Sequence, residues 1–308
     1  MNYTLHQLKV FLKVAEKMSI TKASEELHLT QPAVSIQLKN FQDQFEIPLI
    51  EVIGKQVYVT DFGKEIVDSS KKIIEEVAEI KNKTLAFKGF LTGQLKLSIV
   101  STGKYVMPFF LTDFVHKHRG VSLAMDVTNK ATVIKDLETN KIDFALVSVL
   151  PENLQVKRIE LMENKLYMVR KYNEATKSKL MHTKTMEKTP FIFREKGSAT
   201  HQAMELFIKS HKIPINKTIQ LTSNEAVKQA LLADLGYSIM PLIGLKNELN
   251  NNQLEIVSVK GLPIKTHWNL VWLKEKRLSP IAEAYLAFLQ ENKSAIIENH
   301  FDWYNRTE

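Results

Sequence analysis

Four polar side chains between Thr30 and Phe45 have the types and the spacing needed to read a base pair. We expect a helix here, with Thr30 as its N-cap and Pro32 in its first turn, where proline is tolerated. Its apolar positions, spaced by four, three and four, predict one buried stripe of Val34, Leu38, Phe41 and Phe45. The opposite side would expose Gln31, Ser35, Lys39 and Gln42. Amides and hydroxyls suit base edges and lysine suits phosphate, although an ordinary solvated helix face has the same composition.

A second set of polar residues follows predicted strands at three points later in the chain. They are Ser101 and Thr102 after LKLSIV, Gly197, Ser198 and Thr200 after FIFREK, and Ser223 and Asn224 after TIQL. Each group stands where we expect a helix to begin, and a helix start offers unpaired N–H groups to an anion. Each hydroxyl could instead cap its own helix, which is the simpler explanation for any single one. Three such starts at strand ends favour a ligand site, because open α/β sheets bind ligands there.

The first sixty residues are predicted to form short helices followed by a hairpin. Thr4 and Gln7 make a capping-box pattern at the start of the first helix. A second helix over residues 21–27, a tight turn and the helix beginning at Thr30 have the outline of a helix-turn-helix. In VIGKQVYVT, Gly54 between β-branched flanks predicts a small hairpin.

A long polar helix is predicted over residues 62–87. Its apolar or small residues alternate steps of four and three: Ile66, Ser70, Ile73, Val77, Ile80, Thr84 and Phe87. This is a heptad seam, which pairs helices from two chains, and we favour self-association over packing on the helix's own domain.

After Gly93 short apolar strands alternate with helices, which predicts two α/β units with a cleft between them. The strand over 267–273 and the helix over 280–290 would return to complete the first unit.

Composition narrows the class of protein without settling its function. The chain has 308 residues, 44% of them apolar, and no run of apolar residues long enough to span a membrane. It has no cysteine and no signal-peptide core, which fits a cytoplasmic protein. Residues 1–89 contain twelve lysines and twelve acids, so the net charge of +8 belongs entirely to the remainder. A basic total that suggests nucleic-acid binding would therefore point away from the helix-turn-helix.

The chain resembles LysR-type transcriptional regulators over nearly all of its length to about Leu289. The residues that carry the resemblance include TQPAVS (30–35), the late TDFG (60–63), GQLKLSIVST, NKIDFALV, FREKGSATHQAMELF and SNEAVKQALLADLGYSIMP. It implies an N-terminal all-α winged helix-turn-helix (1–61), a linker helix (62–89) and a two-lobed α/β effector region (90–308) similar to type 2 periplasmic binding proteins. Lobe I would comprise about 90–161 and 267–292, and lobe II about 162–266.

The resemblance also implies which residues meet DNA. Gln31, Pro32 and Ser35 would lie in the major groove, and Gly54, Lys55 and Gln56 would form the wing tip. The full set of DNA-binding candidates is Thr21, Lys22, Thr30, Gln31, Pro32, Ser35, Ile36, Lys39, Lys55 and Gln56. The family often has arginine where this chain has Ile36 and Val52, so we expect weaker phosphate and guanine contacts.

The effector site follows from the same resemblance. It places Ser101, Thr102, Ser148, Ser198 and Thr200 around the cleft, and the positive charge of this region favours a small carboxylated or phosphorylated ligand. The full set of candidates adds two cations and an amide, Lys104, Arg194 and Asn224. His201 stands where the family often has arginine, so recognition there could depend on pH.

These expectations describe a sequence-specific transcriptional regulator that binds promoter DNA. Its linker helices would pair two chains into a dimer, and two dimers would form a tetramer. We expect no catalytic residue, metal or cofactor. Three alternatives remain: an enzyme acting in the cleft, a solute-binding module and a DNA-packaging protein. The first lacks GxSxG, GxxxxGK[ST], GxGxxG and HExxH motifs, and the last should have a basic DNA-binding face. The aromatic tail beyond Asn292 is expected to dock on a neighbouring subunit rather than to fray.

Overall fold

The computed structural model describes residues 2–53, 56–87, 90–174 and 189–306. The chain divides into two compact units, Met1–Phe90 and Leu91–Glu308. Among the described residues, no helix has both the length and the apolar character that crossing a bilayer requires.

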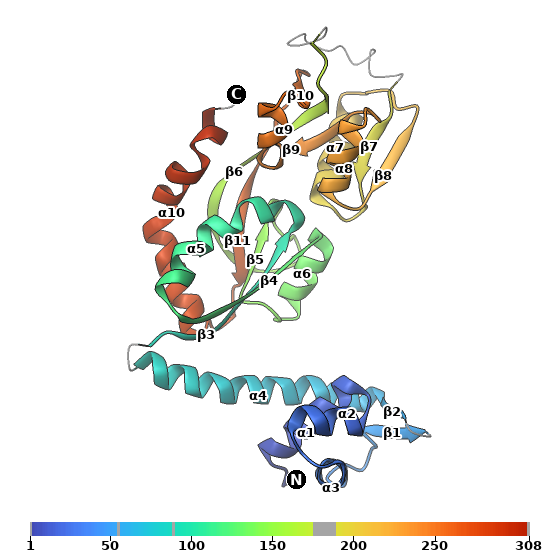
Figure 1. The fold of residues 1–308 in the computed structure, drawn as a ribbon, viewed down its shortest axis with the longest axis vertical. Coiled ribbons are helices and arrows are strands. Elements are labelled where there is room, and N and C mark those ends of the chain that lie inside the picture. Colours follow the sequence, from blue (N-terminus) through green and yellow to red (C-terminus); the bar gives the residue numbers. More distant parts are fainter. Residues whose placement is uncertain (1, 54–55, 88–89, 175–188, 307–308) are drawn as a thin grey trace. The chain divides into compact units, whose positions relative to one another are not determined.

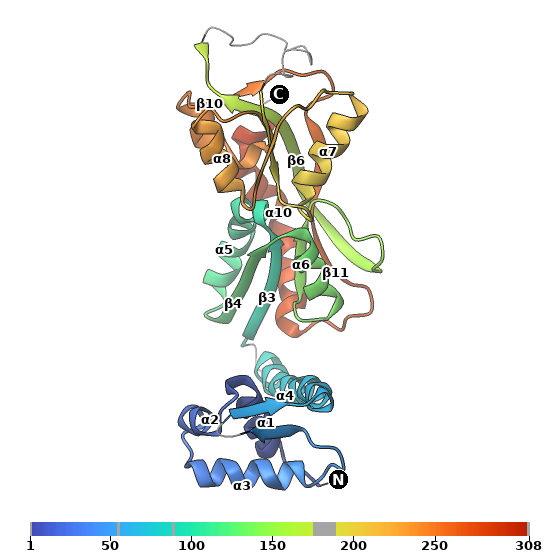
Figure 2. The same ribbon diagram turned by 90° about the vertical axis from the view of Figure 1, so that its right-hand side faces the viewer.

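The N-terminal unit contains three short helices, a hairpin and a long helix. Its elements are α1 (Leu5–Lys17), α2 (Ile20–Leu27), α3 (Gln31–Gln42), β1 (Ile50–Ile53), β2 (Gln56–Val59) and α4 (Asp61–Phe87). The predicted capping box is confirmed, because Thr4 Oγ1 accepts from Gln7 N and Gln7 Oε1 accepts from Thr4 N. Thr30 caps α3 as expected, with its hydroxyl oxygen 3.4 Å from Ala33 N. Figure 2 shows α3 along the outer edge of this unit.

Gln42 does not have the exposed position on α3 that its spacing predicts. Its side-chain Oε1 accepts a hydrogen bond from Leu49 N at 2.8 Å, at the entrance to β1. The side chain is half-buried, because it satisfies a backbone amide in the loop between α3 and the hairpin. The expectation that Gln42 faces a DNA groove is therefore wrong.

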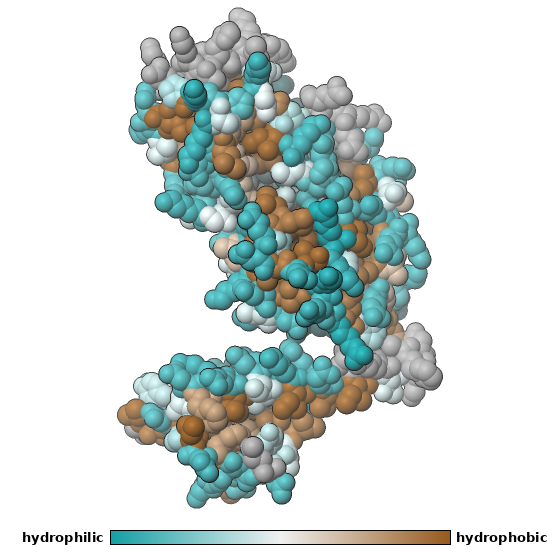
Figure 3. All heavy atoms as spheres, turned by 180° about the vertical axis from the view of Figure 1, so that it is seen from behind, coloured by the Kyte–Doolittle hydropathy of each residue, from teal (hydrophilic) through white to brown (hydrophobic). Residues whose placement is uncertain are grey.

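Helix α4 packs on the rest of the N-terminal unit through residues of its first half. Ile66 packs against the core of this unit and Ser70 is 1% exposed, so these two seam positions are covered within one chain, together with Ile74 beside the seam. Ile73 and Ile80, at 38% and 65% exposure, have no such cover. Figure 3 shows a band of apolar surface along the N-terminal unit. The side chain of Phe87 lies outside the described residues.

The C-terminal unit is built on one seven-stranded sheet with strand order β10-β6-β11-β5-β3-β4, and β9 also pairs with β6 (Figure 1). Lobe I contains β3 (Thr92–Val100), which runs parallel to β4 (Gly120–Thr128) and β5 (Phe144–Val147). Two long antiparallel strands, β6 (Val156–Lys171) and β11 (Ile264–Leu273), pass from lobe I into lobe II. The predicted crossing segments are thus strands of a shared sheet.

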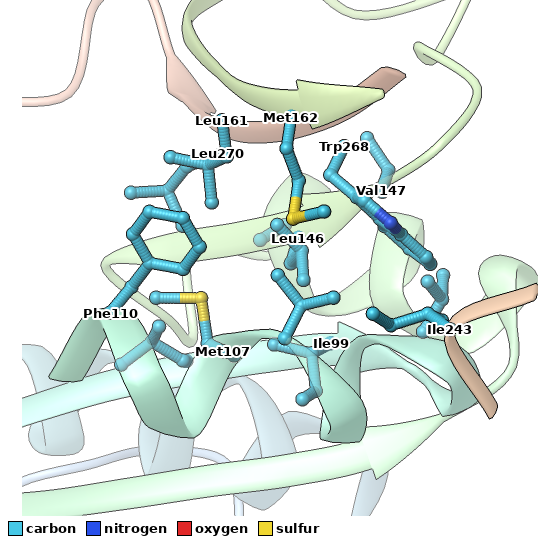
Figure 4. Packing of buried hydrophobic residues seen from close by; sticks show 14 of the residues in the cluster. Ile99, Met107, Phe110, Leu146, Val147, Leu161, Met162, Ile243, Trp268 and Leu270 are labelled. Atoms are coloured by element: carbon cyan, nitrogen blue, oxygen red, sulfur yellow. The ribbon is translucent and has the colours of Figure 1, made fainter. Parts of the chain in front are cut away.

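Helices cover the sheet and complete the two lobes. Lobe I adds the 3₁₀ helix η1 (Ser101–Tyr105), α5 (Met107–Lys117) and α6 (Lys130–Glu138). Lobe II consists of β7 (Phe191–Arg194), α7 (Ala199–Ser210), β8 (Thr218–Leu221), α8 (Asn224–Leu232), β9 (Ser238–Pro241), η4 (Leu242–Gly244), α9 (Lys246–Asn250) and β10 (Leu254–Val257). Strand β7 runs parallel to β8. Figure 4 shows Ile243 of η4 packed with Val147 and Trp268, so a shared apolar core joins the lobes.

The C-terminal helix α10 (Pro280–Arg306) extends well beyond its predicted end at Gln290 and includes the aromatic tail. Phe301 is 2% exposed, with its ring stacked 6.0 Å from that of Phe110. Tyr304 is fully buried, and its hydroxyl oxygen accepts from Lys165 N at 2.6 Å. The expectation that this tail docks on a neighbouring subunit is wrong for these residues, because their apolar surface is buried in the same chain.

Candidate functional site

The outward face of α3 is fixed by what the helix buries. Val34 and Phe41 are fully buried, and the ring of Phe41 lies 5.1 Å from that of Phe11 on α1. Four DNA-binding candidates on the side turned away from this core are exposed: Gln31, Pro32, Ile36 and Lys39. The fifth candidate on this helix, Ser35, is half-buried. The structure therefore brings these candidates together on one surface.

The other DNA-binding candidates come from α2 and the hairpin. Thr21 and Lys22 are exposed in the first turn of α2, which Ser19 caps. Gln56 is exposed on β2, where its Oε1 accepts from Tyr58 OH at 2.6 Å. Lys55 lies outside the described residues.

Two lysines of α1, Lys13 and Lys17, are paired with acids of the same unit. Lys13 Nζ lies 2.9 Å from a carboxylate oxygen of Glu16 and 2.9 Å from one of Glu26. Lys17 pairs with the same two acids. Such exposed pairs contribute little to stability, but they neutralise the outward charge of α1.

A polar cleft between the lobes encloses about 440 Å³, counting the solvent at its mouth. Six of the eight predicted effector residues line it: Ser101, Thr102, Ser148, Arg194, Ser198 and Thr200. They come from η1, from the end of β5 and from the segment that leads from β7 into α7. Small-molecule sites hold a ligand by a few converging polar groups, and the side chains that line this cleft include such groups.

Arg194 ties the two lobes together at this cleft. Its side chain is 3% exposed, and Nη1 donates to Ser101 Oγ of lobe I at 3.1 Å. Its Nε and Nη2 donate to the two carboxylate oxygens of Glu195 at 2.8 and 2.9 Å. Asn224 does not line the cleft, but its Nδ2 donates to the same Ser101 oxygen at 3.2 Å. The charge of Arg194 is therefore already neutralised by a bidentate carboxylate.

The start of α7 is available to a ligand, whereas the start of α8 is not. Ser223 caps α8, with its hydroxyl oxygen accepting from Ala226 N at 3.0 Å. Ser198 occupies the N-cap of α7 but makes no capping hydrogen bond, and its side chain and that of Thr200 line the cleft. For Ser198 the capping explanation is thus wrong. A hydroxyl group and the unpaired N–H groups of a helix start are the kind of donors that suit an anion.

Sequence reasoning missed four polar residues of the cleft: Asn129, Lys130, Asn164 and Thr266. Lys130 begins α6 directly after β4, the same strand-to-helix position that drew attention to Ser101. Within the described part of the chain it makes no ion pair. Asn164 and Thr266 pair across β6 and β11, where no local pattern marks a site.

Lys104 lies on another side of η1 and does not line the cleft. Its Nζ is 3.3 Å from Glu225 Oε1, and Glu225 also accepts from Tyr105 OH and pairs with Lys228 at 3.0 Å. Burial by itself raises the pKa of Glu225, but hydrogen bonds from Tyr105 and Lys228 outweigh it and hold this pKa at about 2. This polar cluster joins η1 of lobe I to α8 of lobe II.

Two other features considered for the site are a metal ion and a pH-dependent contact at His201. No group of three or more acidic or histidine side chains there is placed to hold a metal ion. His201 Nδ1 is 2.6 Å from the carbonyl oxygen of Arg194, so it must donate to that oxygen. Its pH-dependent role stays a prediction.

Comparison with known proteins covers both units. Residues 5–64 match the bacterial regulatory helix-turn-helix protein, lysR family, and residues 88–294 match the LysR substrate binding domain. The chain is 34% identical to the HTH-type transcriptional activator CmpR of Synechocystis over 96% of this chain and 97% of that protein. It is 37% identical to a RuBisCO operon transcriptional regulator of Allochromatium vinosum over 94% and 96%.

Solved structures agree with this similarity. The regulatory domain of Synechocystis CcmR in complex with 2-PG is 30% identical, with a TM-score of 0.61, over 66% of this chain and 98% of that one. Full-length CbnR in complex with its target DNA has a TM-score of 0.69 over 94% of this chain and 99% of that one. At 19% identity CbnR shows the same fold and no more.

Proposed function

Because the chain belongs to the LysR family of transcriptional regulators, we propose that a small anionic metabolite, bound in the cleft between its effector lobes, controls its binding to promoter DNA. The relatives are named as transcriptional regulators, which favours this function over the enzyme, solute-binding and DNA-packaging alternatives. The observation that carries the proposal is the cleft itself, which is lined by the uncapped start of α7 and by Lys130, a lysine without an ion pair among the described residues.

The anion is held by groups from both lobes. Lobe II contributes Ser198, Thr200 and the first amides of α7, and lobe I contributes Thr102 and Lys130. A ligand that bridges these groups stabilises the closed arrangement of the lobes by its differential affinity for it. CcmR binds 2-PG in a regulatory domain of the same family, which makes 2-PG the first compound to test. The Allochromatium vinosum relative is named a RuBisCO operon transcriptional regulator, so a RuBisCO operon promoter is the first DNA to test.

DNA binding is assigned to the outward face of α3, assisted by α2 and the hairpin. Helix α4, through the exposed side chains of Ile73 and Ile80, pairs with the same helix of a second copy. Pairing places two helix-turn-helix units on one DNA, so that their weak contacts add through effective concentration. Two such dimers form the proposed tetramer, in which a ligand alters the arrangement of the DNA-binding units.

Two pairs of variants separate the DNA-binding surface from the effector cleft. Ser35→Ala and Gln31→Ala are expected to abolish specific DNA binding in a band-shift assay while leaving the fold and the oligomer intact. Thr102→Ala and Ser198→Ala are expected to bind DNA normally and to lose the response to ligand. A Ser35→Ala protein that binds the promoter as tightly as the parent would show that α3 does not read the DNA.

The chemical class of the ligand is tested separately. A thermal-shift screen would compare 2-PG, other organic acids and phosphate esters with neutral compounds of similar size. Stabilisation by the anions and none by the neutral compounds is the expected result. Binding of neutral or cationic compounds alone would contradict the proposal.

A further inference from the structure

Helix α3 presents an isoleucine at the centre of its outward face. The buried residues Val34, Leu38 and Phe41 define the inward side of the helix. At 3.6 residues per turn, Ile36 lies on the opposite side, and its side chain is 57% exposed. Any contact of this face with the major groove would therefore bring an apolar side chain against the base edges.

The neighbours of this residue show what else the face offers. Pro32, one turn earlier, is also exposed and has no side-chain donor, and Lys39 and Asn40 are exposed one turn later. Lys39 can meet phosphate and Asn40 can form hydrogen bonds, but the centre of the face has neither donor nor acceptor. The hairpin repeats this character, because Val52 and Ile53 on β1 are 57% and 64% exposed.

Only one group on the major-groove edge of DNA matches such a side chain. Thymine carries a C5-methyl group there, whereas guanine offers acceptors and cytosine offers an amino donor. Packing an isoleucine over guanine or cytosine would remove water from those polar groups and supply no hydrogen bond, which is costly. Packing it over thymine buries a methyl group, which is favourable.

We propose that Ile36 is a specificity-determining residue that packs on a thymine methyl group and selects an A·T pair at one position in each half-site. This inference rests on the proposed function, because it requires α3 to lie in the major groove.

The experiment begins with a DNA probe that the full-length protein selects from a random library of double-stranded oligonucleotides. Each thymine of the enriched half-site is then replaced in turn by deoxyuridine, which removes only the methyl group. At one position the parent protein should bind about fourfold more weakly for each methyl group removed. This factor corresponds to the loss of about 0.8 kcal/mol of burial free energy, since about 1.4 kcal/mol equals a tenfold change in dissociation constant.

Three variants identify the side chain responsible. Ile36→Ala should bind the thymine and deoxyuridine probes equally at that position. Ile36→Arg should select guanine there, because arginine pairs with the guanine acceptors. The matched control is Ile47→Ala, whose isoleucine is 54% exposed but lies in the loop after α3, and it should keep the full deoxyuridine effect. Unchanged thermal unfolding confirms that each variant is folded.

The outcomes separate this inference from the function on which it rests. An enriched sequence without any deoxyuridine effect, or the same effect in Ile36→Ala as in the parent, overturns the role of Ile36 and leaves DNA binding by α3 intact. A library that yields no enriched sequence with the folded oligomer overturns the proposed function and this inference together.

Discussion

Replacing Lys130 by glutamine should weaken the binding of an anionic effector far more than replacing any other lysine near the cleft. Lys130 lines the cleft at the start of α6 and has no acidic partner among the described residues. Arg194 also lines the cleft, but its Nε and Nη2 donate hydrogen bonds to the carboxylate of Glu195. The uncompensated charge of the cleft therefore comes from Lys130 in this part of the chain.

The magnitude follows from the kind of contact that is lost. A hydrogen bond to a charged group contributes about 1.5–3 kcal/mol net, which corresponds to a roughly 10- to 150-fold change in dissociation constant. The matched control is Lys104→Gln. Because Lys104 is paired with Glu225 outside the cleft, its replacement should change the dissociation constant less than about twofold.

The assay is a calorimetric titration of the full-length proteins with 2-PG, or with the anion that binds best in the thermal-shift screen. A neutral ester of the same compound serves as a second control, since its weaker binding should not depend on the charge of residue 130. If Lys130→Gln and the parent bound the anion equally while Lys104→Gln bound it weakly, the charge assignment of the cleft would be refuted.

Three other predictions follow from the described contacts. Phe301→Ala should lower the free energy of unfolding by about 3–5 kcal/mol without changing the oligomer in sedimentation, because it leaves a cavity beside the core of its own chain. The hydrogen bonds that hold the pKa of Glu225 at about 2 stabilise the fold at any pH above 4.5, the ordinary pKa of a glutamate. This stabilisation is lost as the pH falls from 4.5 toward 2. Denaturant unfolding of the parent and Glu225→Gln should therefore differ at pH 6 and converge at low pH, and a constant difference would contradict the assignment. Lys22 on α2 and Lys39 on α3 are exposed and make no ion pair within the described residues. The logarithm of DNA affinity should therefore fall with the logarithm of salt concentration with a slope of about −4 per dimer, measured by fluorescence anisotropy. A slope near −10 would mean that other cations carry the binding.

The family, the order of the elements and most helix starts could be read from local patterns. The capping box at Thr4, the N-cap at Thr30 and the buried stripe of α3 depend on residues a few positions apart. The structure confirms them, except that α3 ends at Gln42 and Phe45 lies beyond it, half-buried. The matches to the helix-turn-helix and to the substrate binding domain confirm the family. Six predicted effector residues meet in one cleft because residues that follow parallel strands gather at one edge of a sheet.

Side chains that act across long sequence separations could not be assigned in this way. Gln42 has the spacing of a DNA-facing residue, but the loop amide of Leu49 takes its side chain. The aromatic tail resembles an unpartnered surface in the sequence, yet Tyr304 packs against β6, 139 residues earlier in the chain.

The sequence by itself determined that this protein has a helix-turn-helix and a two-lobed effector region, and that hydroxyl groups follow its strands. Only the tertiary structure decided which lysine lines the cleft. Lys104 and Lys130 each follow a parallel strand by a few residues and look alike in one dimension. The approach of Glu225 from lobe II neutralises Lys104, whereas the described acids leave Lys130 unpaired. The difference arises because the charge available to a ligand depends on neighbours that folding brings together, and not on the residue alone.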